Sequence, residues 1–338
     1  MTLPDLVTRY QKSVESTLQA TLEGRQHPLY HLIEYQMGWV DEGGTRQARP
    51  SVRVHPTLTL SICEALGGDT AKANPGAMAI ELLHQFTRVH DDIQDGMPDH
   101  ESRPSVWWVW GPAQAINTGD ALHVLGRLLL FNMGNQGVST SQVLGATKVM
   151  DDALLEFFEG QYQDLQIREQ VTVSSDSYLK MAACRSGALM GCAAQIGALV
   201  AGGQKDLQEV CKDAGRKLGL ALHLQHDINE LWGTKPDRSP VTIVRKSYPV
   251  LYAIETAPVA VKREIGSLFA TRVLDPRDLP RLVGLLDEVN AREHCTEAVQ
   301  SAQAAFLSAL IGIGVKQDLL AEFEAFASYL IKHGMTGD

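Results

Sequence analysis

The sequence has few features that would indicate disulfide bonding, zinc binding or export. Its five cysteines are scattered without CxxC or CxxH spacing, which argues against a zinc site or a disulfide framework. A reducing, cytoplasmic setting is therefore expected. The first residues, MTLPDLVTRYQKS, contain no apolar core followed by a small-residue cleavage site. We therefore expect no signal peptide.

Long hydrophobic runs are also scarce. The longest uncharged stretch runs from Gly187 to Gln204, is rich in glycine and alanine, and includes Gln195. It is barely long enough to cross a bilayer. We expect a buried helix against which other helices pack closely, and no transmembrane segment.

An excess of positive charge is absent as well. The chain has 30 lysines and arginines against 40 aspartates and glutamates, with a net charge of −10. This balance leaves no basic surface for nucleic acid or for an anionic membrane. An anionic substrate would therefore need local positive charge or bound cations.

Alternating β-branched segments are nearly missing, whereas apolar residues recur at helical spacing along most of the 338 residues. The pattern predicts an all-α protein. Loops are expected where Gly, Pro and Asp gather, including Val40 to Pro56 and Gly96 to Pro104. None of them resembles an interdomain linker, so we expect one domain over residues 1–338.

Three aspartates close one of the apolar helices. Asp91, Asp92 and Asp95 lie in HDDIQDG, with Asp91 and Asp95 one turn apart on one face. Like charges repel there, and the helix dipole already disfavours anions at a C-terminal end. A bound cation would hold them together, and Mg²⁺ is the natural candidate because it takes carboxylate oxygens and shares its shell with substrate phosphates.

A second apolar helix ends in HDINELWG, with Asp227 and Glu230 at i, i+3. A solvated acidic helix end would explain either cluster alone, but the segment before Asp227, LGLALHLQ, is too apolar for a surface face. Two carboxylate clusters on facing helices of a bundle predict a metal-clamped pocket.

An ordered set of motifs over nearly the whole chain resembles the trans-prenyl diphosphate synthases, also called polyprenyl synthetases. The motifs are LGGD (66–69), HDDIQD (90–95), RPSVWWVWG (103–111), NTGDAL (117–122), EGQYQDL (159–165), RSGAL (185–189), HDINELWG (226–233) and RKSYP (245–249). Each is weak alone, whereas the ordered set is specific.

The resemblance implies a helical bundle around a deep central cavity, commonly a homodimer, which binds a prenyl diphosphate through a cluster of up to three Mg²⁺ ions. The implied metal-binding residues are Asp91, Asp92, Asp95, Asp227 and Glu230, together with Asp164, which like Gln161 resembles the second shell. The implied diphosphate contacts are Arg185, Lys246, Arg53 and Gln161. Phe86 and Thr87 would border the cavity, and the small Thr87 leaves room for a C15 to C20 chain.

The segment that binds isopentenyl diphosphate in chain-elongating relatives departs from the family pattern. Its lysine is replaced by Val52, its distal arginine by His55, and an arginine pair by His100 and Glu101. Each lost charge-assisted contact is worth roughly 1.5–3 kcal/mol, so elongation should suffer. Arg46, Arg49 and Arg103 lie close by in the sequence and could provide a relocated site.

The second acidic motif departs too, because His226 stands where an aspartate is usual and His223 where glutamine is usual. Imidazole is a poor Mg²⁺ ligand, so His226 would bond the diphosphate, act as a base toward a carbocation, or be a satisfied core histidine. We place it among the catalytic residues. The NDxxSxxxE pattern of ordinary class I terpene cyclases is absent.

Three hypotheses follow. The first is a class I terpene synthase, a lyase that ionises a prenyl diphosphate and lets the cation cyclise, lose a proton or capture water. The second is a short-chain trans-prenyltransferase of the farnesyl or geranylgeranyl diphosphate synthase type. The third is a non-catalytic partner subunit, which the retained aspartates argue against because a dead subunit has no use for clustered like charges.

Overall fold

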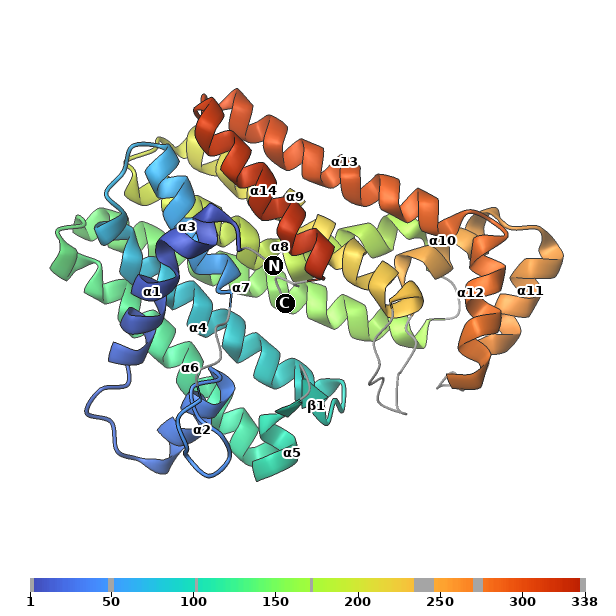
Figure 1. Ribbon diagram of the computed structural model, residues 1–338, viewed down its shortest axis with the longest axis horizontal. Helices are drawn as coiled ribbons and strands as arrows, with labels where there is room; N and C mark the ends of the chain where they lie inside the picture. The colour runs from blue at the N-terminus through green and yellow to red at the C-terminus, as the bar shows by residue number, and fades with distance from the viewer. Residues whose placement is uncertain are drawn as a thin grey trace.

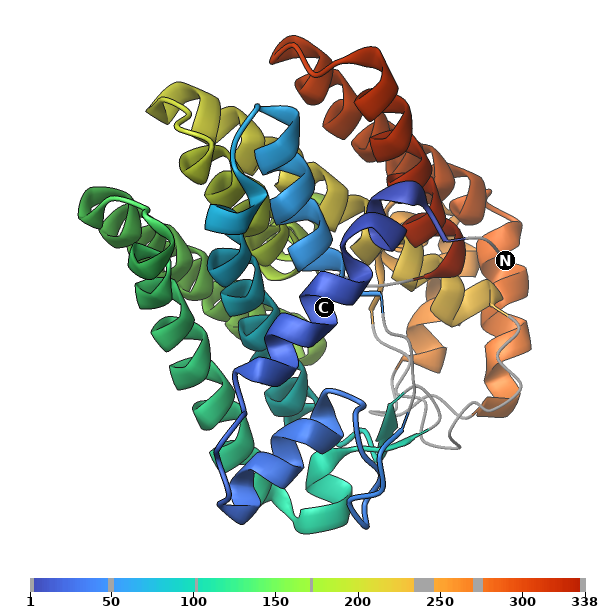
Figure 2. The ribbon, with the colours of Figure 1, turned by 60° about the vertical axis from the view of Figure 1, so that its left-hand side comes forward.

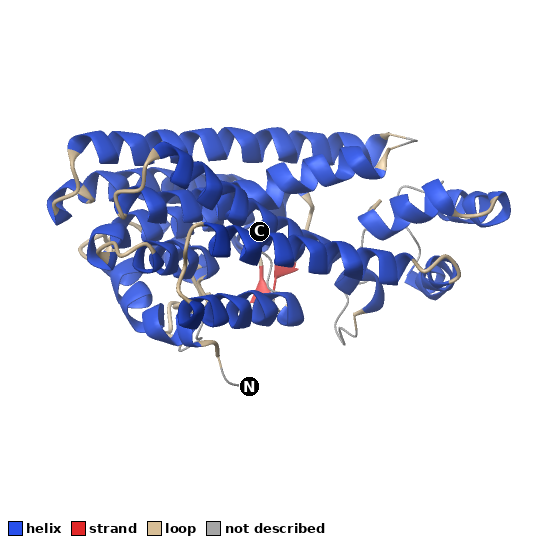
Figure 3. Ribbon diagram, turned by 90° about the horizontal axis from the view of Figure 1, so that it is seen from above, coloured by secondary structure: helices blue, strands red, loops and turns tan. Residues whose placement is uncertain are grey.

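The computed structural model of the protein describes residues 3–47, 52–100, 103–170, 173–233, 246–269 and 276–334. These residues form an all-α protein in which two short strands are the only sheet (Figure 3). The helices are α1 (Asp5–Ala20), α2 (Pro28–Gln36), α3 (Val54–Ala65), α4 (Thr70–Gln94), α5 (Val106–Trp110), α6 (Pro112–Asn132), α7 (Thr140–Glu169), α8 (Ser175–Val200), α9 (Lys205–Trp232), α10 (Tyr248–Thr256), α11 (Val259–Leu268), α12 (Leu279–Asp287), α13 (Ala291–Gly312) and α14 (Gln317–His333), with 3-10 turns at Gly134–Gln136 and Pro276–Asp278. The predicted fold class is confirmed.

The two strands, β1 (Asp99–His100) and β2 (Arg103–Pro104), pair antiparallel within the segment expected to be a loop after α4. The other expected loop also ends earlier than predicted, because α3 already begins at Val54. Pro56 falls in the first turn of that helix, where its missing N–H has no intrahelical partner to lose.

Helix α8 runs through the middle of the molecule (Figure 1). It packs against α3, α4, α7 and α9, and nearly every residue from Met181 to Val200 is buried. By length and composition it is the one helix of the described residues apolar enough to span a membrane, yet most of its apolar stretch is buried inside the protein. This burial agrees with the interpretation of a core helix.

Glycines let α8 and α9 approach closely. A Cβ added at Gly219 of α9 would lie 2.3 Å from the carbonyl oxygen of Ser186, and one at Gly215 would lie 2.3 Å from that of Met190. The two helices therefore pack almost backbone to backbone. This approach places Ser186 of α8 beside His223 of α9.

The remaining helices surround this centre. In Figure 2, α3 and α4 lie between α6 and α7 on one side and α13 and α14 on the other, and α13 packs along α9. Helices α10 to α12 form a smaller apolar cluster at the end of the molecule, together with Leu231 of α9. The expectation of one domain over residues 1–338 stays a prediction.

Candidate active site

The first acidic cluster lies at the C-terminal end of α4. The helix begins at the N-cap Asp69, whose carboxylate accepts the N–H of Ala71 at 3.0 Å, and it ends with Asp95 as its C-cap. Asp92 is almost completely buried. Burial, followed by the charges of Asp91, Asp95 and Asp99, raises the pKa of Asp92 to about 7, although Arg88 opposes the shift. The cluster therefore favours a counter-cation.

Two arginines connect this cluster to Asp164 of α7. Arg185 of α8 lies 3.3 Å from Oδ2 of Asp91 and 3.1 Å from Oδ2 of Asp164. Arg168 lies 2.6 Å from Oδ1 of Asp95 and also pairs with Asp164. The predicted residues Asp91, Asp95, Asp164 and Arg185 are thus brought together.

Gln161 lies at the same end of α4. Its side-chain amide donates to the side-chain carbonyl of Gln94, and it is buried on α7 one turn before Asp164. The structure places Gln161 beside the first acidic cluster. Its contact with a substrate diphosphate stays a prediction.

The second acidic cluster lies at the end of α9. Asp227 is buried, and its Oδ2 accepts the Tyr178 hydroxyl at 2.8 Å and the Tyr248 backbone N–H at 3.0 Å. Burial raises the pKa of Asp227, and the charge of Glu230 adds to this, while His223 and the two hydrogen bonds oppose it. His226 lies 3.3 Å from Glu230, with 39% of its side chain exposed. His226 is therefore not a buried core histidine.

Tyr178 of α8 lies beside the second cluster and is close enough to Asp164 of α7 to feel its charge. Burial and then the charges of Asp227, Asp164 and Glu230 raise the pKa of its hydroxyl, so carboxylates of α7 and of α9 both act on one phenol. The ring nitrogens of His223 lie 3.1 Å from this hydroxyl and 2.6 Å from that of Ser186. His223 thus bridges the hydroxyls of Tyr178 and Ser186.

Lys246 lies near the ends of α7 and α9. Its ammonium donates to the backbone carbonyl of Gln170, directly after α7, and burial lowers the pKa of Lys246. Two residues later, Tyr248 donates its N–H to Asp227. This segment places a cation at the end of α7, two residues from the backbone contact to Asp227.

Arg53 has a different environment from the one predicted. It is buried, and its guanidinium donates to Glu15 at 2.7 Å, to Glu81 at 3.2 Å and to the carbonyl of Met37 at 2.8 Å. Burial opposes its charge, but Glu81 and Glu15 raise the pKa of Arg53 overall. Because each guanidinium nitrogen already donates to a protein oxygen, this geometry does not support a contact with a substrate diphosphate.

The other residues at or near the expected isopentenyl diphosphate site lie in the core, at the surface or outside the described residues. Val52 packs against the apolar core and His55 is completely buried. Arg49, Glu101 and the side chain of His100 lie outside the described residues. Arg103 stacks over the ring of Tyr35 at 3.9 Å, and Arg46 lies 3.6 Å from Glu34 at the surface.

Phe86 and Thr87 lie on α4, between the core and the first cluster. Phe86 is buried, and its ring lies 5.3 Å from that of His123 on α6 and 6.0 Å from that of Phe158 on α7. Thr87 is buried and donates its hydroxyl to the carbonyl of His84 at 2.8 Å. Their role at a cavity wall stays a prediction.

Arg168 and Tyr178 contact the site carboxylates but were not among the predicted residues. Arg168 could have been found, because it follows Asp164 by four residues in a helical segment, the spacing of a helical ion pair. Tyr178 gives no comparable signal, since its partners His223 and Asp227 lie 45 and 49 residues away in the sequence.

The donor set of the two clusters suits Mg²⁺. Hard carboxylate oxygens predominate at the end of α4 and around Asp227, and burial together with the neighbouring aspartates raises the pKa of Asp92. Arg168 and Arg185 pair with carboxylates of the first cluster and with Asp164. Their guanidinium groups hold these carboxylates at positions from which oxygen atoms could bind a divalent cation.

Comparison with known proteins gives a consistent result. Residues 46–285 match the family model of the polyprenyl synthetases. The chain is 28% identical to a (2E,6E)-farnesyl diphosphate synthase of Mycobacterium tuberculosis, over 98% of this chain and 93% of the relative. It is 30% identical to a geranylgeranyl diphosphate synthase of the same organism, over 90% and 89%. The crystal structure of a polyprenyl synthetase from Streptomyces coelicolor superposes with a TM-score of 0.85 at 27% identity, covering 96% of this chain and 98% of that one.

Proposed function

Because this chain belongs to the polyprenyl synthetase family, we propose that it is a magnesium-dependent short-chain trans-prenyltransferase. It would ionise an allylic prenyl diphosphate and join the allyl cation to isopentenyl diphosphate. The observation that carries the proposal is the group of carboxylates from three helices: Arg185 joins Asp91 of α4 to Asp164 of α7, and Asp227 of α9 is buried and hydrogen-bonded to Tyr178. The names of the relatives support this chemistry, since both curated relatives described above are diphosphate synthases.

In this proposal Asp91, Asp92, Asp95 and Asp227, with Glu230 beside them, hold the ions. Bound Mg²⁺ supplies the positive charge that makes diphosphate an adequate leaving group. The protein's own cations add to it: Arg185 exchanges part of its pairing with Asp91 and Asp164 for the arriving phosphate oxygens, and Lys246 reaches them from the end of α7.

The acidic clusters and their arginines are positioned before substrate arrives. Arg168 and Arg185 hold Asp95, Asp91 and Asp164 in fixed places, while Tyr178 and the Tyr248 N–H hold Asp227. Groups already oriented toward the developing charge need little rearrangement during the reaction. This arrangement supports ionisation of the diphosphate as the common first step.

A second function is favoured by the replacements in the segment that binds isopentenyl diphosphate in chain-elongating relatives. Val52 and His55 replace cations, and Arg53 is engaged by Glu15, Glu81 and Met37. An enzyme that ionises the allylic diphosphate but binds isopentenyl diphosphate weakly would act as a terpene synthase. The cation from a C15 to C20 substrate would then cyclise, lose a proton or capture water.

Product analysis separates the two functions. The purified protein is incubated with Mg²⁺ and geranyl, farnesyl or geranylgeranyl diphosphate, each with and without isopentenyl diphosphate. Longer diphosphates that appear only with isopentenyl diphosphate support the prenyltransferase. A hydrocarbon or alcohol formed from one substrate alone would instead identify a terpene synthase, and no turnover of any substrate would favour a non-catalytic partner subunit.

We also infer that the protein forms a homodimer through α6 and α7. Large apolar side chains are exposed at helical spacing along one stripe of each helix, and contiguous apolar surface of this kind marks interaction sites. The exposed residues are Val124, Leu128 and Phe131 on α6, and Leu144, Leu155, Phe158, Tyr162 and Leu165 on α7. The family resemblance makes a second copy of this chain the expected partner.

A further inference from the structure

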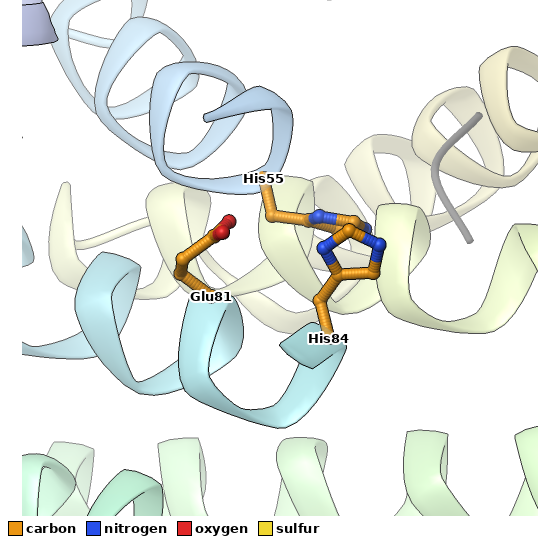
Figure 4. Close-up of side chains that lie close together, drawn as sticks. All are labelled: His55, Glu81 and His84. Carbon is orange, nitrogen blue, oxygen red and sulfur yellow. The ribbon is translucent and has the colours of Figure 1, made fainter. Parts of the chain in front are cut away.

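His55, Glu81 and His84 form a second group of metal-ligating side chains, separate from the acidic helix ends. His55 lies in the first turn of α3, whereas Glu81 and His84 lie one turn apart on α4, ahead of Asp91. All three are buried, and one ligand atom of each lies within 4.8 Å of the others. Figure 4 shows the carboxylate and the two rings directed toward one another.

The chemistry of this group differs from that of the acidic clusters. Two imidazoles and one carboxylate suit zinc and neighbouring first-row transition metals, whereas Mg²⁺ prefers oxygen ligands alone. Glu81 and His84 also have the Glu-x-x-His spacing that points metal ligands into the core of helical bundles. Any ion here would be distinct from the proposed Mg²⁺ cluster.

The two carboxylate oxygens of Glu81 have different surroundings. Its Oε1 accepts Arg53 at 3.2 Å and Gln85 at 3.0 Å, while its buried Oε2 accepts no hydrogen bond from the described residues. Buried carboxylate oxygens are rarely left in that state. A carboxylate held through one oxygen and offering the other is the arrangement that metal sites use.

We propose that His55, Glu81 and His84 bind one divalent transition-metal ion, which ties α3 to α4. Metal–ligand bonds of about 2.0–2.2 Å require ligand atoms roughly 3 Å apart. Rotation of the two rings, whose centroids lie 4.5 Å apart, would close the remaining distance. Arg53 does not leave an excess of positive charge, because Glu15 neutralises it at 2.7 Å. Three protein ligands leave a fourth position for water.

Cobalt provides the direct test. The purified full-length protein is stripped with a chelator and titrated with Co²⁺ in excess Mg²⁺, while the visible absorption is followed. We expect saturation at one Co²⁺ per chain with the intense bands of a low-coordinate site, and displacement by Zn²⁺. His55→Gln and His84→Gln should each weaken Co²⁺ binding by roughly 10- to 100-fold or more, whereas the control His294→Gln, outside the group, should bind as the wild type does.

Two results would overturn the proposal: only the weak spectrum of oxygen-bound octahedral Co²⁺ in the wild type, or variants at 55 and 84 that bind as tightly as the wild type. If those variants do not fold, X-ray absorption at the zinc edge of the wild-type protein decides. Scattering from two imidazoles is expected, and its absence contradicts the site. None of these measurements depends on enzymatic turnover.

Discussion

At the scale of single residues, Asp92 is placed where a carboxylate is least stable, at the buried C-terminal end of a helix beside two other aspartates. Its pKa of about 7 exceeds that of an unfolded aspartate, near 4. The native state therefore binds the proton more tightly than the unfolded state, and stability falls as pH rises through this window. The penalty is complete above pH 7 and absent below about pH 4.

We predict that Asp92→Asn stabilises the metal-free protein at pH 8 by about 1–4 kcal/mol, since each pKa unit corresponds to about 1.4 kcal/mol. The gain should shrink as pH falls toward 5, because wild-type Asp92 then becomes protonated. Urea denaturation in the presence of a chelator measures it, with Asp152→Asn at a half-exposed site as the control. A gain that does not change with pH would show that charge is not its cause.

Residue identities at the site were partly predictable. Asp91, Asp92 and Asp95 could be found because their spacing and the helix that carries them are both local in the sequence. The surroundings of Arg53 could not, because Glu15 and Glu81 come from helices 38 and 28 residues away. Whether an arginine faces substrate or a buried carboxylate depends on tertiary packing that no local pattern encodes.

At the scale of elements, the close approach of α8 and α9 positions the second cluster. We predict that Gly219→Ala destabilises the protein by about 1–3 kcal/mol, the usual effect of overpacking. The new methyl group would lie 2.3 Å from the Ser186 carbonyl oxygen, so α8 and α9 must move apart. That shift would also disturb the Ser186–His223 contact.

The matched control is Gly284→Ala on α12, where an added Cβ meets nothing within 4 Å. It should be neutral or stabilising by up to about 1 kcal/mol, through helix propensity alone. Thermal unfolding of both variants gives the comparison. Equal effects would mean that helix propensity, and not the α8–α9 contact, decides the outcome at Gly219.

The spacing of apolar residues predicted the helices. It predicted the helix ends and the loops less well. The early start of α3 at Val54 and the strand pair inside 96–104 both depend on how the chain returns to the core. The run from Gly187 to Gln204 was recognisable as a buried helix because its glycines and alanines suit close packing, and α8 carries most of it. Its neighbours could not be inferred from composition.

At the scale of the whole molecule, the exposed apolar stripes on α6 and α7 predict a dimer that surface charge should disrupt. Val124→Glu and Leu155→Glu should each weaken self-association by about 100-fold or more, because burying an unpaired carboxylate at an interface costs several kcal/mol. Val259→Glu, on the similarly exposed surface of α11, is the control. Sedimentation velocity distinguishes the states, and a monomeric wild type would contradict the inferred dimer.

The central claim is that the two acidic helix ends, loaded with Mg²⁺, ionise an allylic diphosphate. Its most direct test is the rate of inorganic diphosphate release from farnesyl diphosphate, with isopentenyl diphosphate present, for the wild type, Asp91→Ala and Asp227→Ala. We predict release that requires Mg²⁺ and falls by about 100-fold or more in each folded variant. Release without Mg²⁺, or at the wild-type rate in either variant, would contradict the assignment of these carboxylates.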